Sequence, residues 1–112
     1  DRLGSGQPPG HLGVAVGTYH VWWDPLVHAQ LARAAGRILC FQVSDWLLPV
    51  GDPLHGRGLP GDGLIEVRRL RTEADAAGYD GPIEVEIFNH DLWAEEGRQV
   101  LERMRASYLE HV

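Results

Sequence analysis

The sequence has few of the features that mark secreted, membrane-spanning or nucleic-acid-binding proteins. It holds a single cysteine in 112 residues, so it cannot form a disulfide within the chain. No apolar run approaches the ~20 residues that span a bilayer, and the first residues lack the basic and apolar segments of a signal peptide. The formal net charge of −6 argues against a phosphate-backbone partner. We therefore expect a cytoplasmic protein with no nucleic-acid or membrane partner.

The composition is that of a folded globular domain. Hydrophobic residues make up 44% and charged residues 23% of the chain, whose length suffices for one domain with one core. The cysteine, Cys40, lies in the apolar run "RILCFQV", where we expect it to be a small core residue. Arg68, Arg69 and Arg71 form a basic cluster, which we expect on the solvent face of a helix.

Apolar periodicity and turn residues predict three strand–helix units. Residues 1–11 lack an apolar pattern and are expected to be a loop or a frayed end. The other predicted elements are a strand over 12–18, a helix from Asp24-Pro25 to Gly36, a strand over 37–43, a long loop over 44–63, a helix over about 65–77, a strand over 83–88 and a helix over about 94–110.

This alternation is typical of an α/β protein with a parallel sheet and right-handed crossovers. In such sheets the working residues lie at the C-terminal ends of the strands and in the loops that follow. We therefore expect the polar side chains at the three strand exits to face one pocket. They are Thr18, Tyr19, His20, Gln42, Ser44, Asp45, Arg57, Glu84, Glu86, Asn89 and His90.

Tryptophans flank two of these strand exits. Trp22 and Trp23 follow the first strand, and Trp46 follows the second. Aromatic faces combined with a few polar groups suit a hydroxylated ligand such as a sugar or polyol. A carboxylate with nearby histidine and oxygen ligands suits a divalent cation.

Most of these residues also have a purely structural interpretation. Glu84 can point to solvent at a sheet edge, and Trp22 and Trp23 can simply cover the sheet core. The glycine-rich segment 56–63, "GRGLPGDG", lacks the lysine of a P-loop. A small doubly wound nucleotide-binding domain is disfavoured, because the first strand-to-helix turn has no glycine fingerprint. Several histidines stand in settings typical of surface residues: His28, His55, His90 and His111.

Taken together in this order, "YHVWWDP", "DWLLP", "GRGLPGDG" and "AAGYDGPIEVEIF" resemble the C-terminal part of the sugar phosphate isomerase/epimerase family, the xylose-isomerase-like TIM barrels. The resemblance runs over residues 12–112. It implies a partial (β/α)8 barrel whose three βα units match about the sixth to eighth strands. It also implies metal-dependent enediolate chemistry on a sugar or sugar phosphate.

The resemblance assigns roles to individual residues. Glu86 matches the last metal ligand of the family, which also serves as an acid/base carboxylate, and His20 and Arg57 match substrate-contacting residues. The family's metal-binding Asp and His fall at Gly17 and Gln42, of which only Gln42 offers a weak oxygen ligand. The implied cofactor is a divalent Mn, Mg, Co or Zn ion, loosely held or lost.

Two hypotheses follow. In the first, the chain is the C-terminal part of a metal-dependent sugar isomerase or epimerase, incomplete or inactive by itself. In the second, it is a degenerate, non-catalytic carbohydrate-binding or interaction module. An open three-stranded piece of a barrel exposes two strand edges, so we expect it to associate with itself or with an upstream barrel half.

Overall fold

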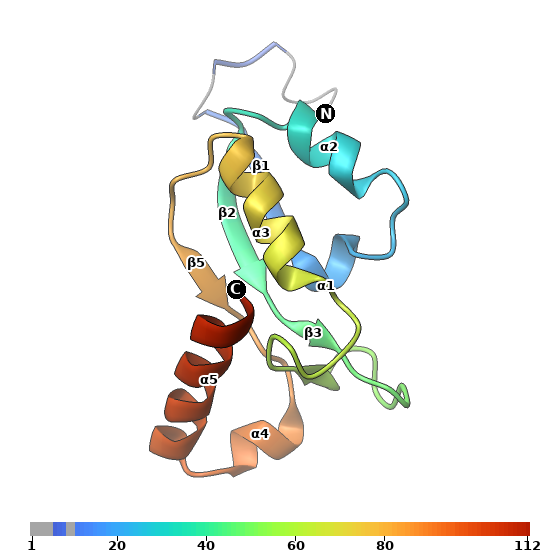
Figure 1. Cartoon of the computed structure of the whole chain (residues 1–112), viewed down its shortest axis with the longest axis vertical. Coiled ribbons are helices and arrows are strands. Elements are labelled where there is room, and N and C mark those ends of the chain that lie inside the picture. Colours follow the sequence, from blue (N-terminus) through green and yellow to red (C-terminus); the bar gives the residue numbers. More distant parts are fainter. Residues whose placement is uncertain (1–5, 9–10) are drawn as a thin grey trace.

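The structure is a computed structural model that describes residues 6–8 and 11–112. Strands and helices alternate along most of the chain, which confirms the predicted α/β class (Figure 1). The predicted N-terminal loop covers residues 1–11, of which 1–5 and 9–10 lie outside the described residues. In the described part of the chain, no helix is both long enough and apolar enough to cross a membrane.

The main sheet has three parallel strands in the order β1-β2-β5. These strands are β1 (Val14–Gly17), β2 (Ile38–Val43) and β5 (Ile83–Val85). The chain passes from β1 to β2 through α2 (Val27–Arg33) and from β2 to β5 through α3 (Val67–Ala76). The three predicted βα units are therefore present, with β2 in the centre and β1 and β5 at the edges of the sheet.

Helices α2 and α3 cover one face of the sheet, and the main core lies between them and the strands. Phe41 and Val43 of β2 are fully buried there, against Val27 and Leu31 of α2. The predicted helix started at Asp24-Pro25, but α2 begins at Val27, and Leu26 before it is 58% exposed. Val27 and Leu31, one helical turn apart, face the sheet.

The opposite face of the sheet carries polar side chains. Gly17 pairs in register with Gln42, and Gln42 with Glu84, so the three residues form one row across the strands. Gln42 Nε2 donates a hydrogen bond to Glu84 Oε2 at 3.0 Å, and Cys40 Sγ lies 3.5 Å from the same oxygen. Cys40 is therefore half-buried on this face rather than a core residue as predicted. Burial and the hydrogen bond to Glu84 raise the pKa of its thiol.

The segment 44–63 is not the structureless loop that the sequence predicted. Two short strands within it, β3 (Asp45–Trp46) and β4 (Arg57–Gly58), pair antiparallel. Asp45 is fully buried, and its carboxylate accepts hydrogen bonds at 2.8–2.9 Å from the backbone amides of Trp46, Gly61, Gly63 and Ile65. Hydrogen bonds to an ionised acceptor are the strong ones, so this one side chain fixes the path of the segment.

The third strand is shorter than predicted. It ends at Val85 rather than at residue 88, because the chain beyond it bonds to the β4 segment. The amide of Arg57 donates to the carbonyl oxygen of Phe88 at 3.1 Å, and Gly56 forms an antiparallel bridge with Asn89. The strand exit of β5 and the end of the 44–63 segment are thereby joined.

Two helical predictions also need correction. The predicted final helix is in fact two helices, α4 (His90–Ala94) and α5 (Gly97–His111), whose first turns are capped by the side chains of Asn89 and Glu96. A short helix, α1 (Thr18–Val21), occupies the place of the predicted loop after β1. Both changes follow from local caps and turns that hydrophobic periodicity does not record.

The Asp45 carboxylate should be indispensable to folding. In Asp45→Asn, an NH₂ group faces amide donors in place of an acceptor, and the buried charge is lost. We expect the free energy of unfolding to fall by about 2–4 kcal/mol, as measured by urea denaturation. Asp62→Asn is the matched control, since Asp62 is exposed in the same turn. Equal stability of the two variants would contradict this role of Asp45.

Candidate functional site

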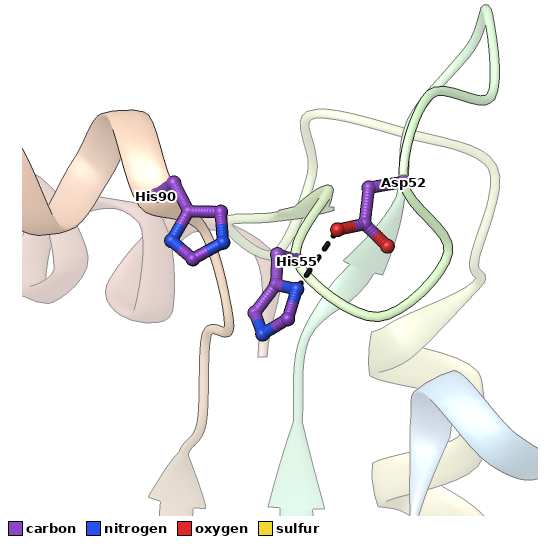
Figure 2. A group of neighbouring side chains, drawn as sticks. All are labelled: Asp52, His55 and His90. Carbon is purple, nitrogen blue, oxygen red and sulfur yellow. Dashed lines mark hydrogen bonds and ion pairs between the residues drawn. The ribbon is translucent and has the colours of Figure 1, made fainter.

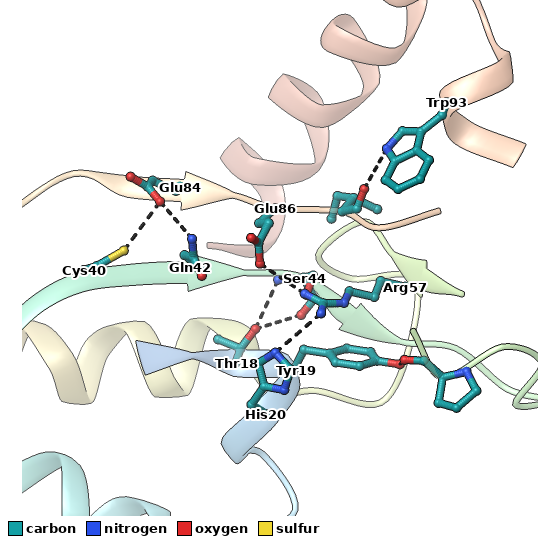
Figure 3. Close-up of polar contacts among 12 residues, drawn as sticks. Thr18, Tyr19, His20, Cys40, Gln42, Ser44, Arg57, Glu84, Glu86 and Trp93 are labelled. Carbon is teal, nitrogen blue, oxygen red and sulfur yellow. Dashed lines mark hydrogen bonds and ion pairs between the residues drawn. The ribbon is translucent and has the colours of Figure 1, made fainter. Parts of the chain in front are cut away.

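The site is built around Arg57, a guanidinium almost removed from solvent. Its side chain is 4% exposed, and Cζ lies 4.5 Å from the ring centroids of both Tyr19 and Phe88. Such cation–π contacts favour a guanidinium in a partly desolvated place. NH1 donates to Glu86 Oε2 at 3.1 Å, and the two groups form an ion pair (Figure 3). Arg57 therefore joins the exits of β1 and β5.

His20 reaches the same guanidinium from the first strand exit. Its Nε2 lies 3.4 Å from Arg57 NH2, and its ring meets the ring of Tyr19 edge-on at 5.7 Å. The Nε of Arg57 is buried and has no hydrogen-bond partner among the described residues. The structure thus brings together His20, Arg57 and Glu86, which the sequence predicted as site residues, and it leaves one buried donor unsatisfied.

The ring of Tyr19 lies against the Arg57 guanidinium. Its hydroxyl donates to the carbonyl oxygen of Pro53 at 2.8 Å, which ties the first strand exit to the 44–63 segment. The pKa of the Tyr19 hydroxyl is raised, mainly by burial. The Arg57 charge opposes this rise, and the Asp52 charge adds to it. The phenol accordingly stays protonated and keeps its role as a donor.

Other residues expected at the pocket hold the backbone instead. Thr18 Oγ1 donates to the carbonyl oxygen of Ser44 at 2.8 Å and accepts the Ser44 amide at 3.1 Å, in a fully buried pair. Asn89 caps α4 and donates to the carbonyl oxygen of Arg57 at 2.9 Å. Asp45 binds the four amides described above. These side chains position the site and offer no free polar atom to a ligand.

The three tryptophans are not equivalent. Trp46 stacks on Tyr19 with ring centroids 5.0 Å apart, and Trp22 lies 5.8 Å from Trp46, so both pack beside the site and against the core. Trp22 Nε1 is buried without a hydrogen-bond partner among the described residues. Trp23, by contrast, is 65% exposed. Substrate contact by these rings stays a prediction.

The residues at the family's metal positions do not fit a hard divalent cation. Gly17 has no donor side chain, and Gln42 directs its amide NH₂ to Glu84. The Glu86 carboxylate is already paired with Arg57. Mg²⁺ and Ca²⁺ take six or more oxygen ligands, several of them charged, whereas one paired carboxylate and one amide remain here. The metal roles predicted for Glu86 and Gln42 therefore find no support in this geometry.

A second group of titratable side chains lies nearby and was missed in the sequence. Figure 2 shows Asp52, His55 and His90, whose ligand atoms all lie within 4.8 Å of one another. The amide of Leu54 and the ring of His55 both donate to Asp52 and lower the pKa of its carboxyl. The Asp-x-x-His spacing is a weak signal for this group, but the approach of His90 depends on tertiary contacts that no local pattern records.

The candidate site is an open edge and not a closed pocket. A cavity of about 490 Å³ is lined by Gly61, His111 and residues 65–69, and it holds none of the predicted site residues. Arg57 lines a smaller hollow of about 150 Å³ together with Asn89 and Asp91. The larger cavity lacks the charged groups that surround Arg57, so the residues around Arg57 are the candidate functional site.

Comparison with known proteins places this geometry in a family. The xylose isomerase-like TIM barrel family matches residues 5–106. The crystal structure of protein SMc04130 from Sinorhizobium meliloti 1021 is similar at a TM-score of 0.86 and 41% identity, over 88% of this chain and 37% of that one. This chain thus spans little more than a third of that protein's length. No curated protein matches it.

The match covers most of the chain, and the βα units agree with it. The chain belongs to the xylose isomerase-like TIM barrel family, of which it forms a partial barrel.

Proposed function

We propose that the chain forms part of a sugar isomerase or epimerase, and that a sugar or polyol binds at the strand ends beside Arg57 and Glu86. The observation that carries this proposal is the Arg57 guanidinium. It is 4% exposed, yet it reaches the half-buried Glu86 and the exposed His20, and its Nε has no hydrogen-bond partner within residues 6–8 and 11–112. Protein groups that combine a positioned cation with a carboxylate suit a substrate with adjacent carbonyl and hydroxyl oxygens.

The proposed chemistry is proton transfer through an enediolate. The Glu86 carboxylate removes a proton from the carbon next to the substrate carbonyl, and the electron pair moves onto the carbonyl oxygen. Arg57 stabilises that developing oxyanion by donating a hydrogen bond. Return of the proton to the former carbonyl carbon, while the proton of the adjacent hydroxyl passes to the oxyanion, gives an isomer. Return of a proton to the other face of the original carbon gives an epimer. We propose that a second proton-transferring group comes from outside residues 1–112.

Members of the family often use a divalent metal. Because the donor set around Glu86 and Gln42 does not fit such an ion, the proposed steps involve protein groups alone. We therefore propose no Mn, Mg, Co or Zn ion at Glu86 and Gln42.

A non-catalytic carbohydrate-binding or interaction module is the second candidate. Gly17 and Gln42 favour it, because they replace two ligand residues of the family. The ion pair with Arg57 also favours it, since the Glu86 carboxylate is already engaged by a cation 3.1 Å away. The two candidates differ in one measurable respect: only the enzyme exchanges a carbon-bound proton of the sugar with solvent.

Proton exchange should depend on Glu86. We expect the chain to catalyse deuterium incorporation next to the carbonyl of a ketose in D₂O, as followed by NMR, and Glu86→Gln to slow it at least about 100-fold. Glu84→Gln is the matched control, because Glu84 lies on β5, two residues before Glu86, and bonds to Gln42 rather than to Arg57. Sugar binding without any deuterium incorporation by the unaltered chain would establish the binding module instead.

Sugar affinity should depend on the shape of the Arg57 side chain. Lysine keeps the charge but loses the planar, forked donor group, so we expect Arg57→Lys to weaken binding of ketoses or polyols at least about 10-fold by calorimetry. Arg69→Lys is the control, since Arg69 is 55% exposed on α3 and pairs with Glu66 and Glu73 rather than with Glu86. Unchanged affinity in a folded Arg57→Lys variant would exclude Arg57 from the binding site.

We also propose that further barrel strands, or a second copy of the chain, cover the two open sheet edges. The sheet also exposes apolar side chains. Val14 on the edge strand β1 is 43% exposed, and Leu39 on the central strand β2 is 54% exposed. Unpaired edges and exposed apolar groups favour association. Light scattering should therefore give a mass above that of one chain, whereas a monomer that unfolds cooperatively would contradict this expectation.

A further inference from the structure

Asp52, His55 and His90 form a cluster that the proposed sugar chemistry does not use. One potential ligand atom from each lies within 4.8 Å of the other two. Two separate segments supply them: Asp52 and His55 belong to the loop before β4, and His90 begins α4. Figure 2 shows the His55 ring placed between the other two side chains.

Backbone contacts hold these two segments together. Gly56 forms a bridge with Asn89, and the Arg57 amide donates to the carbonyl oxygen of Phe88 at 3.1 Å. The Asn89 side chain donates to the carbonyl oxygen of Arg57 at 2.9 Å. The residues next to His55 and His90 are thus hydrogen-bonded to one another, so the proximity of the two imidazoles does not depend on flexible side chains alone.

The loop itself is folded tightly around the Asp52 carboxylate. The Leu54 amide donates to Oδ1 at 2.9 Å, which leaves Oδ2 facing His55 Nδ1 at 2.8 Å. A Cβ at Gly56 would lie 2.6 Å from the carbonyl oxygen of Asp52, so this close return of the chain requires glycine. The carboxylate is therefore oriented before any ligand arrives.

The two imidazoles are also constrained by an aromatic neighbour. Their rings stack with centroids 4.2 Å apart at 23°, and Trp93 meets them edge-on at 5.9 Å from His55 and 5.3 Å from His90. Trp93 is itself fixed by a hydrogen bond from Nε1 to the carbonyl oxygen of Ile87 at 3.2 Å. In the described part of the chain, the His90 ring makes no hydrogen bond, so both of its nitrogens remain available.

We propose that Asp52, His55 and His90 bind a divalent first-row transition-metal ion of the Zn²⁺ type. Two imidazole nitrogens and one carboxylate oxygen suit Zn²⁺ and its neighbours, whereas Mg²⁺ and Ca²⁺ take oxygen ligands. Ligands of a tetrahedral Zn²⁺ lie about 3.3 Å apart, so the exposed Asp52 and His90 and the half-buried His55 would move closer together to hold the ion. Three protein ligands leave one position open to water or another small ligand.

The cluster of Asp52, His55 and His90 shares no residue with the proposed sugar site. It contains neither Glu86 nor Gln42, and it can hold an ion whether or not a sugar binds beside Arg57. Ion binding by this cluster also explains why two histidines and a tryptophan gather at an exposed edge of the molecule.

The test is a calorimetric titration of the whole chain with Zn²⁺ alone, together with NMR of the imidazole signals. We expect one ion per chain, shifted signals of His55 and His90, and affinity at least about 10-fold weaker in both His90→Gln and Asp52→Asn. His28→Gln is the matched control, because His28 pairs with a single carboxylate, that of Glu73, at 2.6 Å. Circular dichroism verifies that each variant is folded.

Glu86→Gln separates this site from the family's metal positions. Affinity retained in Glu86→Gln and in His28→Gln, but lost in His90→Gln and Asp52→Asn, supports the proposal. Absence of Zn²⁺ binding by the unaltered chain overturns it, as does binding that His90→Gln leaves unchanged or that Glu86→Gln abolishes.

Discussion

The Arg57 guanidinium is the interaction on which the arrangement of the strand ends depends. It contacts Tyr19 from the first strand exit, and Phe88 and Glu86 from the third. Its own strand, β4, is held in turn by the buried Asp45 carboxylate, which fixes the turn after Gly58 through three backbone amides. A buried cation needs a partner and a polarisable surrounding, and the chain supplies both from segments far apart in sequence.

The charged Arg57–Glu86 pair differs from the neighbouring row of residues on the sheet. Gly17, Gln42 and Glu84 lie side by side across the sheet, and the first two stand where the resemblance places metal ligands of the family. Here the Gln42 amide donates to the Glu84 carboxylate. The chain thus has the Arg57–Glu86 ion pair, whereas Gly17 and Gln42 carry no charged ligand. In the cluster of Asp52, His55 and His90, the two histidines adjoin the bridged residues Gly56 and Asn89, so nitrogen and oxygen ligands gather at the same edge.

Local patterns predicted much of the fold and less of the site. The apolar runs around Val16 and Phe41 and the alternating apolar residues around Val85 predicted the three strands. The β3–β4 pair was missed because each strand has only two residues and depends on Asp45 reaching amides far along the chain. The motif resemblance singled out His20, Arg57 and Glu86, and the structure places these three side chains in one group. The His55–His90 approach needed tertiary contacts, as did the separation of the exposed Trp23 from the packed Trp22.

The central claim is that a sugar binds against Arg57. The most direct measurement is NMR of the arginine Nε–H signals while a ketose is added to the chain. The account predicts that the Arg57 Nε–H signal, a buried donor without a partner among the described residues, shifts in a saturable manner together with the Phe88 amide, while that of Arg69 stays in place. A titration that leaves Arg57 unmoved, or that shifts only residues of the cavity at 65–69, would contradict it.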